Sequence, residues 1–196
     1  MKVLITSYTT PQASHRFCFF HKIVGDFTYF VASDVCENFP YDFNVAALKN
    51  KCIKAARITQ PDWLVLLSGI DAGLSKLPNF KKLDENILYL GKKICRAKVP
   101  EKASNWILSK KIYNNYLIDE SYKCYGWEDY DFTFNTCKDL KKETLDDFLT
   151  VDILPDPDHL KLVNRDEYAI KTCQQNEKLF FDKYKALHGF DFVFPD

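Results

Sequence analysis

The sequence lacks the cysteine spacings typical of disulfide-rich or zinc-binding domains. Its seven cysteines are an odd number, and no two of them form a Cys-x-x-Cys pair. A disulfide framework and a zinc ribbon are therefore poorly supported. Cys18, Cys52 and Cys173 lie in apolar-rich stretches, which predicts that they pack as small hydrophobic side chains in a reducing compartment.

Long apolar runs and an excess of one charge are also missing. No stretch approaches the roughly 20 apolar residues that span a bilayer, and the apolar run at residues 3–5 is too short for a signal peptide. Lys and Arg together number 27, as do Asp and Glu, so only a local basic patch would attract nucleic acid or anionic membranes. We expect a soluble, cytoplasmic protein without a membrane span or a nucleic-acid partner.

Glycine is scarce, and its absence after the first apolar run argues against one class of enzyme. The chain has six glycines, none of them between Thr6 and Arg16. A nucleotidyltransferase would need a glycine-rich phosphate loop there. What the chain does have is apolar surface, because 46% of its residues are hydrophobic and 15% are aromatic. In 196 residues this composition predicts one domain with a sizeable core.

Strand and helix patterns alternate over the first seventy residues. Runs rich in β-branched or aromatic residues predict strands, and apolar residues at helical spacing predict helices. The expected order is strand 3–7, helix 14–24, strand 27–32, helix 44–59 and strand 63–67. Such alternation is typical of an α/β domain with a largely parallel sheet flanked by helices.

Polar residues follow each predicted strand. They occur at residues 6–8, 33–34 and 68–71. In parallel sheets ligands bind beyond the carboxyl ends of the strands. We therefore expect these three clusters to converge on one crevice.

The second half of the sequence is less regular. We expect two strands around a turn, a mixed segment, a short helix and a long helix, at residues 86–91, 92–97, 104–111, 140–149 and 166–188. The apolar face predicted for the long helix consists of Ile170, Cys173, Phe180, Tyr184 and Leu187.

An acidic cluster stands out in this half. Glu128, Asp129 and Asp131 lie within four residues and are surrounded by aromatic rings. One interpretation is a solvated turn before a helix, where acids favour the positive helix N-terminus. The other is a site that needs a base beside an apolar platform.

The segment around these acids resembles a known motif. Residues 117–132 (LIDESYKCYGWEDYDF) are similar to the pattern F-D-E-x-F-x-x-x-G-W-E-D-x-D-F of inverting glycosyltransferases of the GT-A fold. The similarity is to family 2 enzymes and to the catalytic domains of β-1,4-galactosyltransferases and chondroitin polymerases. It extends less specifically from Val3 to about Lys185, and implies a single GT-A-like (Rossmann-like) catalytic domain over residues 1–196.

The resemblance assigns a role to each residue of the Gly-Trp-Glu-Asp motif. Asp129 would take the proton from the acceptor hydroxyl as that oxygen attacks the anomeric carbon, and such general-base help is worth ~10²–10⁴ in rate. Glu128 would bind acceptor hydroxyls, and Trp127 would stack on the acceptor sugar. Structural roles are expected for the other acids, which cap or order adjoining segments: Asp119, Glu120 and Asp131.

A donor pocket is implied at the predicted strand ends. Thr6, Tyr8 and Asp34 would line the pocket for the nucleotide base, usually uracil, because a carboxylate accepts the ring N–H and an aromatic ring stacks on it. Lys49 and Asn50 stand in the place of the family's Arg-Asn pair, where a cation would face the diphosphate. An ordinary solvated lysine face is the alternative interpretation of this helix.

Metal binding is implied less directly. The family has an Asp-x-Asp pair after the third strand, whereas this chain has Gly69 at the first position and Asp71 at the second. His159 lies where family members supply a metal-binding histidine, although a surface-loop histidine is the alternative. Asp71 and His159 would form a mixed site suited to Mn²⁺, or to Mg²⁺.

The resulting hypothesis is an inverting glycosyltransferase. It would move a sugar from a nucleotide-sugar donor, most simply a UDP-sugar, to a hydroxyl of a glycan acceptor. The alternative is a catalytically degenerate nucleotide- or glycan-binding protein of the same fold, which the altered residues 68–71 favour. The intact Glu128-Asp129 pair argues against it.

Overall fold

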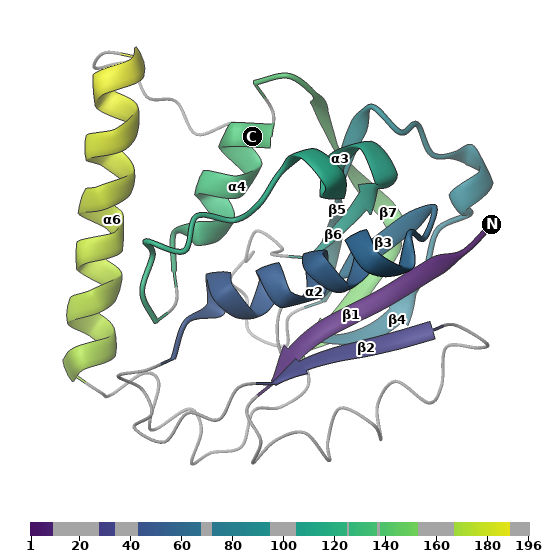
Figure 1. Cartoon of the computed structure of the whole chain (residues 1–196), viewed down its shortest axis with the longest axis horizontal. Coiled ribbons are helices and arrows are strands. Elements are labelled where there is room, and N and C mark those ends of the chain that lie inside the picture. The colour runs from purple at the N-terminus through teal and green to yellow at the C-terminus, as the bar shows by residue number, and fades with distance from the viewer. Residues whose placement is uncertain are drawn as a thin grey trace.

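The strands of this computed structural model form one seven-stranded sheet of order β2-β1-β3-β6-β5-β7-β4 (Figure 1). The model describes residues 1–9, 28–33, 43–67, 72–94, 105–124, 126–136, 138–152 and 167–188. Its elements are β1 (Val3–Thr9), β2 (Thr28–Ser33), α2 (Val45–Thr59), β3 (Trp63–Leu66), β4 (Ala72–Lys76), the short 3₁₀ helix η2 (Phe80–Lys82), β5 (Ile87–Ile94), β6 (Trp106–Ser109), α3 (Lys110–Asn115), α4 (Glu128–Thr136), β7 (Lys141–Asp152) and α6 (Glu167–His188).

The sheet is mixed. β1 pairs in parallel with both β2 and β3, and β5 pairs in parallel with β7. The pairs β3–β6, β5–β6 and β4–β7 are antiparallel. The predicted α/β class, with a mixed sheet flanked by helices, is confirmed, and the parallel pairing predicted for the first three strands is found as expected.

Two apolar clusters cover the two faces of the sheet. One joins strand residues such as Leu64 and Leu108 to Cys52 and Ile53 of α2 and Ile112 of α3. Figure 1 shows α2 lying across this face. The other cluster, on the opposite side of the sheet, contains the aromatic residues Trp63, Phe80, Tyr89 and Phe148. Burial on both faces explains why the third strand is continuously apolar.

Helix α2 brings polar residues to the carboxyl edge of the parallel strands. Its N-cap is Asn44, whose side-chain oxygen accepts a hydrogen bond from the backbone N–H of Ala47 at 2.9 Å. The helix ends at Gln60 in the left-handed conformation, just before Pro61. Lys49 is in the second turn of α2 and is fully buried.

Strand register places two aromatic residues at the same edge. Thr6 of β1 lies opposite Leu66 of β3, and Leu66 lies opposite Trp106 of β6. Tyr8 is two residues beyond Thr6 and so points to the same face of the sheet. Tyr8 and Trp106 therefore flank the region where ligands of parallel sheets bind.

The turn predicted between residues 86–91 and 92–97 is wrong. Residues 87–94 form one strand, β5, with a register shift between Gly91 and Lys92. Gly91 is needed for close packing, because a Cβ at this position would lie 2.9 Å from the ring of Phe148 on β7.

The short helix predicted at residues 140–149 is also wrong. This segment is β7, which pairs with β5 on one side and β4 on the other. Lys, Glu and Leu favour helices locally, but sheet pairing on both sides overrides that preference. β4 was not predicted, since its sequence AGLSK has no strand pattern.

The long C-terminal helix, α6, is confirmed, and its predicted apolar face is confirmed at Phe180 and Tyr184. Its buried side chains recur every four residues at Thr172, Asn176, Phe180 and Tyr184. Ile170, predicted to lie on the apolar face, is 46% exposed. The helix predicted at residues 14–24 lies outside the described residues.

Candidate functional site

The acidic cluster forms the first turn of α4 and is largely buried. Glu128, Asp129 and Asp131 all lie in this turn, where the positive end of the helix dipole favours carboxylates. The side chains of Glu128 and Asp131 are only 5% and 3% exposed, whereas that of Asp129 is 29% exposed. A solvated turn therefore does not describe this cluster, and Asp129 is its carboxylate most open to solvent.

Lys49 of α2 lies against two of these acids. Its Nζ donates a hydrogen bond to Oε1 of Glu128 at 3.1 Å and another to Oδ1 of Asp129. The Nζ also lies 4.9 Å from the ring centre of Trp106 and 5.7 Å from that of Tyr8. Both rings add cation–π attraction to this buried ammonium. The diphosphate contact predicted for Lys49 stays a prediction, and the contacts that the structure shows for its Nζ are with these carboxylates and rings.

Burial and charge act in opposite directions on Lys49. Burial alone would lower the pKa of the ammonium, but the carboxylates of Asp129 and Glu128 outweigh burial and raise the pKa above its usual value. Lys49 is thus a permanent cation at physiological pH. Because a buried charge must be compensated, the pairing fixes Lys49 and the two carboxylates in one arrangement.

One carboxylate oxygen of Glu128 accepts no hydrogen bond. In the part of the chain that the structure describes, its Oε2 is the one buried side-chain nitrogen or oxygen without a hydrogen-bond partner. Buried polar atoms are normally satisfied, and leaving one unpaired costs about 1–3 kcal/mol. This oxygen belongs to the same carboxylate that accepts from Lys49 and lies next to the partly exposed Asp129.

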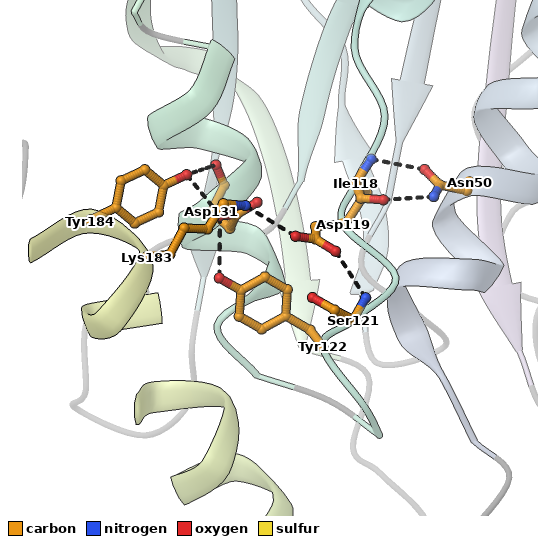
Figure 2. Close-up of polar contacts among 8 residues, drawn as sticks. All are labelled: Asn50, Ile118, Asp119, Ser121, Tyr122, Asp131, Lys183 and Tyr184. Carbon is orange, nitrogen blue, oxygen red and sulfur yellow. Dashed lines mark hydrogen bonds and ion pairs between the residues drawn. The ribbon is translucent and has the colours of Figure 1, made fainter. Parts of the chain in front are cut away.

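Asn50 of α2 holds the loop that leads to α4. Its Nδ2 donates to the carbonyl oxygen of Ile118 at 2.8 Å and to Oε1 of Glu120 at 2.9 Å, while its Oδ1 accepts from the N–H of Ile118 at 2.9 Å. Figure 2 shows the paired bonds with Ile118. The amide predicted to bind the donor is thus used to position the loop. The ordering role expected for Glu120 agrees with this contact.

Helix α6 holds the same loop from the other side. The side chain of Asn176 accepts from the N–H of Lys123 at 3.1 Å and donates to the carbonyl oxygens of Lys123 and Gly126 at 2.7 and 3.1 Å. One turn later, the ring of Phe180 packs 5.2 Å from that of Trp127. The loop is therefore fixed by both hydrogen bonds and aromatic packing.

Asp131 connects α4 to α6. Its Oδ1 accepts hydrogen bonds from the hydroxyls of Tyr184 at 2.7 Å and Tyr122 at 3.2 Å, and pairs with Nζ of Lys183 at 2.7 Å (Figure 2). Lys183 also pairs with Asp119 of the loop at 3.0 Å. The sequence predicted a helix cap at Asp131, whereas the carboxylate is the centre of a buried network.

The loop carries backbone strain just before the two acids. Cys124 and Trp127 have positive φ values of 55° and 71°, and Gly126 has φ of 92°. Non-glycine residues held in this region cost about 1–3 kcal/mol each and persist only where the surroundings fix them. The contacts from α2 and α6 supply that restraint.

Replacing Gly126 with Ala is expected to destabilise the protein by about 1–3 kcal/mol. The new Cβ would lie 2.9 Å from Sγ of Cys173, at a positive φ that alanine rarely adopts. Thermal unfolding measures the loss. Adding Cys173→Ala removes the close contact but not the φ penalty, so only part of the loss should be recovered. An unchanged melting temperature for Gly126→Ala would contradict the strained geometry.

The structure brings four of the predicted site residues together: Tyr8, Lys49, Glu128 and Asp129. Thr6 is fully buried, and its hydroxyl donates to the carbonyl oxygen of Val65 at 3.1 Å, so it is used within the sheet. Trp127 is adjacent but packs on Phe180, Phe181 and Tyr130. The remaining predicted site residues lie outside the described part of the chain: Asp34, Asp71 and His159.

Sequence reasoning missed two contributions to the site. Trp106 was part of an apolar strand, and only the register of β6 against β3 places it beside Lys49. The hydroxyls of Tyr122 and Tyr184 were also missed, because their common partner is visible only once α6 packs on α4. The four-residue spacing of Asn176, Phe180 and Tyr184 was the available signal for that packing.

The described residues contain no group of three or more His, Cys, Asp or Glu side chains that could hold a metal ion. Among the helices within the described ranges, none combines the length and apolarity needed to cross a bilayer.

Comparison with known proteins supports the fold. No family model and no curated protein matches this sequence. The crystal structure of A197 from STIV is similar with a TM-score of 0.55 and 13% identity, over 79% of this chain and 87% of that chain. A glycosyltransferase involved in the glycosylation of the major capsid of PBCV-1 matches with a TM-score of 0.44 and 12% identity, over 90% of this chain and 100% of that chain.

These similarities concern architecture. At 13% identity, the similarity to A197 shows a shared fold alone. The described sheet and helices are consistent with the GT-A-like fold expected from the sequence.

Proposed function

We propose that this protein is an inverting glycosyltransferase that moves a sugar from a nucleotide-sugar donor, most simply a UDP-sugar, to a hydroxyl of a glycan. Asp129 is the general base. The observation that carries the proposal is the cluster of Lys49, Glu128 and Asp129 at the carboxyl edge of the sheet. It provides a partly open carboxylate, paired with a buried ammonium, beside a second carboxylate with an unpartnered oxygen.

The reaction needs one proton acceptor and one leaving group. The acceptor hydroxyl oxygen forms a bond to the anomeric carbon while its proton moves to Asp129. At the same time the bond from that carbon to the donor's phosphate oxygen breaks, and the nucleoside diphosphate leaves with the bonding electrons. Attack on the face opposite the leaving group inverts the configuration. A positioned base of this kind is worth ~10²–10⁴ in rate.

The leaving diphosphate needs compensating charge, which Lys49 is not placed to give because it is paired with two carboxylates. We propose that Mn²⁺ or Mg²⁺, held by Asp71 and His159, supplies this charge. A bound divalent ion would neutralise the diphosphate as it leaves. Tyr8, at the end of β1 beside Lys49, is the proposed stacking partner of the nucleotide base.

A second candidate is a degenerate binding protein of the same fold. Its support is the sequence at residues 68–71, where Gly69 replaces the family's first acid. Such a protein would bind a nucleotide or a glycan without transferring a sugar. Donor binding and transfer therefore have to be measured separately.

A thermal-shift titration with UDP, GDP, CDP and dTDP, each with and without Mn²⁺, tests donor binding. A nucleotide at about 100 times its dissociation constant stabilises the fold by ~2.7 kcal/mol. We expect UDP to raise the melting temperature when Mn²⁺ is present. In Asp71→Asn, adding Mn²⁺ should no longer increase that shift. A shift without the metal would eliminate the metal proposal. No shift with any nucleotide would contradict the transferase, and a shift without sugar transfer would favour the binding protein.

A further inference from the structure

We propose that Lys49 is a positioning residue that holds the Asp129 carboxylate ionised and in a fixed direction. This goes beyond the diphosphate contact that the sequence suggested, and its meaning for catalysis rests on the proposed function. Lys49 and Asp129 are 80 residues apart in the chain, so the pairing is a product of the fold. It joins the second turn of α2 to the first turn of α4.

The geometry around Lys49 is built to hold a cation in one place. The ammonium is fully buried and bonded to one oxygen of Glu128 and one of Asp129. The ring of Tyr8 from β1 and the ring of Trp106 from β6 lie beside the same Nζ. Groups from three elements therefore restrict a side chain that is usually among the most mobile.

The two carboxylates differ in what surrounds them. Glu128 is almost fully buried, whereas Asp129 contacts Lys49 through Oδ1 and is 29% exposed. A carboxylate fixed by an interior cation and reachable from solvent has the arrangement that a base needs. Without that ammonium, the two carboxylates would lie close together with no shared counter-ion.

Other titratable groups around the pair do not account for a change near neutral pH. Tyr8 of β1 faces Lys49, and Cys52 of α2 lies within its electrostatic reach. Burial raises the pKa of Cys52 to about 12. Burial also raises the pKa of Cys173 of α6, and the negative charges of Glu177 and Glu128 raise it further. Both thiols stay protonated, which leaves the carboxylates as the groups that respond to Lys49.

Replacing Lys49 with Met tests the inference through the pH profile of sugar transfer. Methionine fills similar volume without charge, so Asp129 is protonated more easily. We expect the acidic limb of the transfer rate to move at least one pH unit upward, with the rate recovering as the pH is raised. A residue with only a packing role would lower the rate equally at every pH. Lys49→Arg keeps the charge and should leave the limb at its wild-type position.

Thermal unfolding provides a test that does not depend on activity. Lys49→Met should lower the melting temperature at neutral pH because two carboxylates lose their counter-ion. Adding Asp129→Asn should recover part of that loss, whereas independent sites would give additive losses. Additive losses, or failure of both the single and the double variant to fold, would overturn the inference. Coupled stabilities in a protein that transfers no sugar would reject the proposed function while supporting Lys49 as the residue that holds Asp129.

Discussion

Replacement of Asp129 by Asn is expected to lower the rate of sugar transfer by about 10²–10⁴ while the fold is retained. The amide cannot accept the proton that leaves the acceptor hydroxyl. It still offers an oxygen to Nζ of Lys49, which is the contact that the carboxylate makes in the structure. The change therefore removes the base and keeps the geometry around it.

Two measurements separate this effect from a loss of donor binding. The nucleotide-induced thermal shift of Asp129→Asn should match that of the unaltered protein, and only the transfer rate should fall. Glu143→Gln is a control that likewise replaces a carboxylate with an amide, since Glu143 is an exposed carboxylate on β7. It should change neither quantity. An unchanged transfer rate for Asp129→Asn would reject the assignment of the base.

The sequence predicted the elements whose pattern is set locally. The third strand is a continuous apolar run, and the helix at residues 45–59 has an N-cap, helical spacing and a proline after its end. These features need no knowledge of the neighbours. The acids of α4 also stood out in the sequence, because the order of residues around Glu128 and Asp129 resembles a known motif.

The errors arose where neighbours decide the structure. Glycine is common in turns, and a turn was predicted beside Gly91. In the structure this position requires glycine because the ring of Phe148 approaches too closely for a side chain. β7 is rich in helix-forming residues, yet it lies between β5 and β4. In both cases long-range pairing outweighs local preference.

The sequence suggested candidate site residues, but it did not predict the contacts that the described ones make. Lys49 was expected to be a cation near the site, but its partners are 79 and 80 residues away in sequence. Asn50 was expected at the ligand, and its three hydrogen bonds are instead with the loop that leads to α4. The residue types can be read from the sequence. The hydrogen-bond partner of each polar group is determined only when the chain packs.

Replacement of Asp131 by Ala is expected to lower the free energy of unfolding by about 2–5 kcal/mol. The carboxylate is buried and accepts from the hydroxyls of Tyr122 and Tyr184. Removing it leaves both hydroxyls without this acceptor. Lys183 contributes less to the loss, because its side chain is 35% exposed and keeps its pairing with Asp119. Chemical denaturation at neutral pH measures the difference.

Asp131→Asn is the matched variant, since its amide oxygen can still accept one of these hydrogen bonds. It should lose less stability than Asp131→Ala. Both variants should also lose transfer activity, because the network joins α4 to α6 and so fixes the turn that carries Asp129. A loss below about 0.5 kcal/mol for Asp131→Ala, the range of ordinary surface substitutions, would contradict this view of the network.

The same network predicts how stability responds to high pH. Burial, followed by the charge of Asp131, raises the pKa of both Tyr122 and Tyr184 above the usual value. A raised folded-state pKa means that the folded protein keeps a proton which the unfolded chain releases above about pH 10. Stability is therefore complete below pH 10 and falls above it, by up to about 1.4 kcal/mol per pH unit for each such group. In Asp131→Asn the charge is gone while burial remains, so the alkaline fall should be smaller than in the unaltered protein. An equally steep fall would mean that burial alone sets these pKa values and that Asp131 does not act on the two hydroxyls.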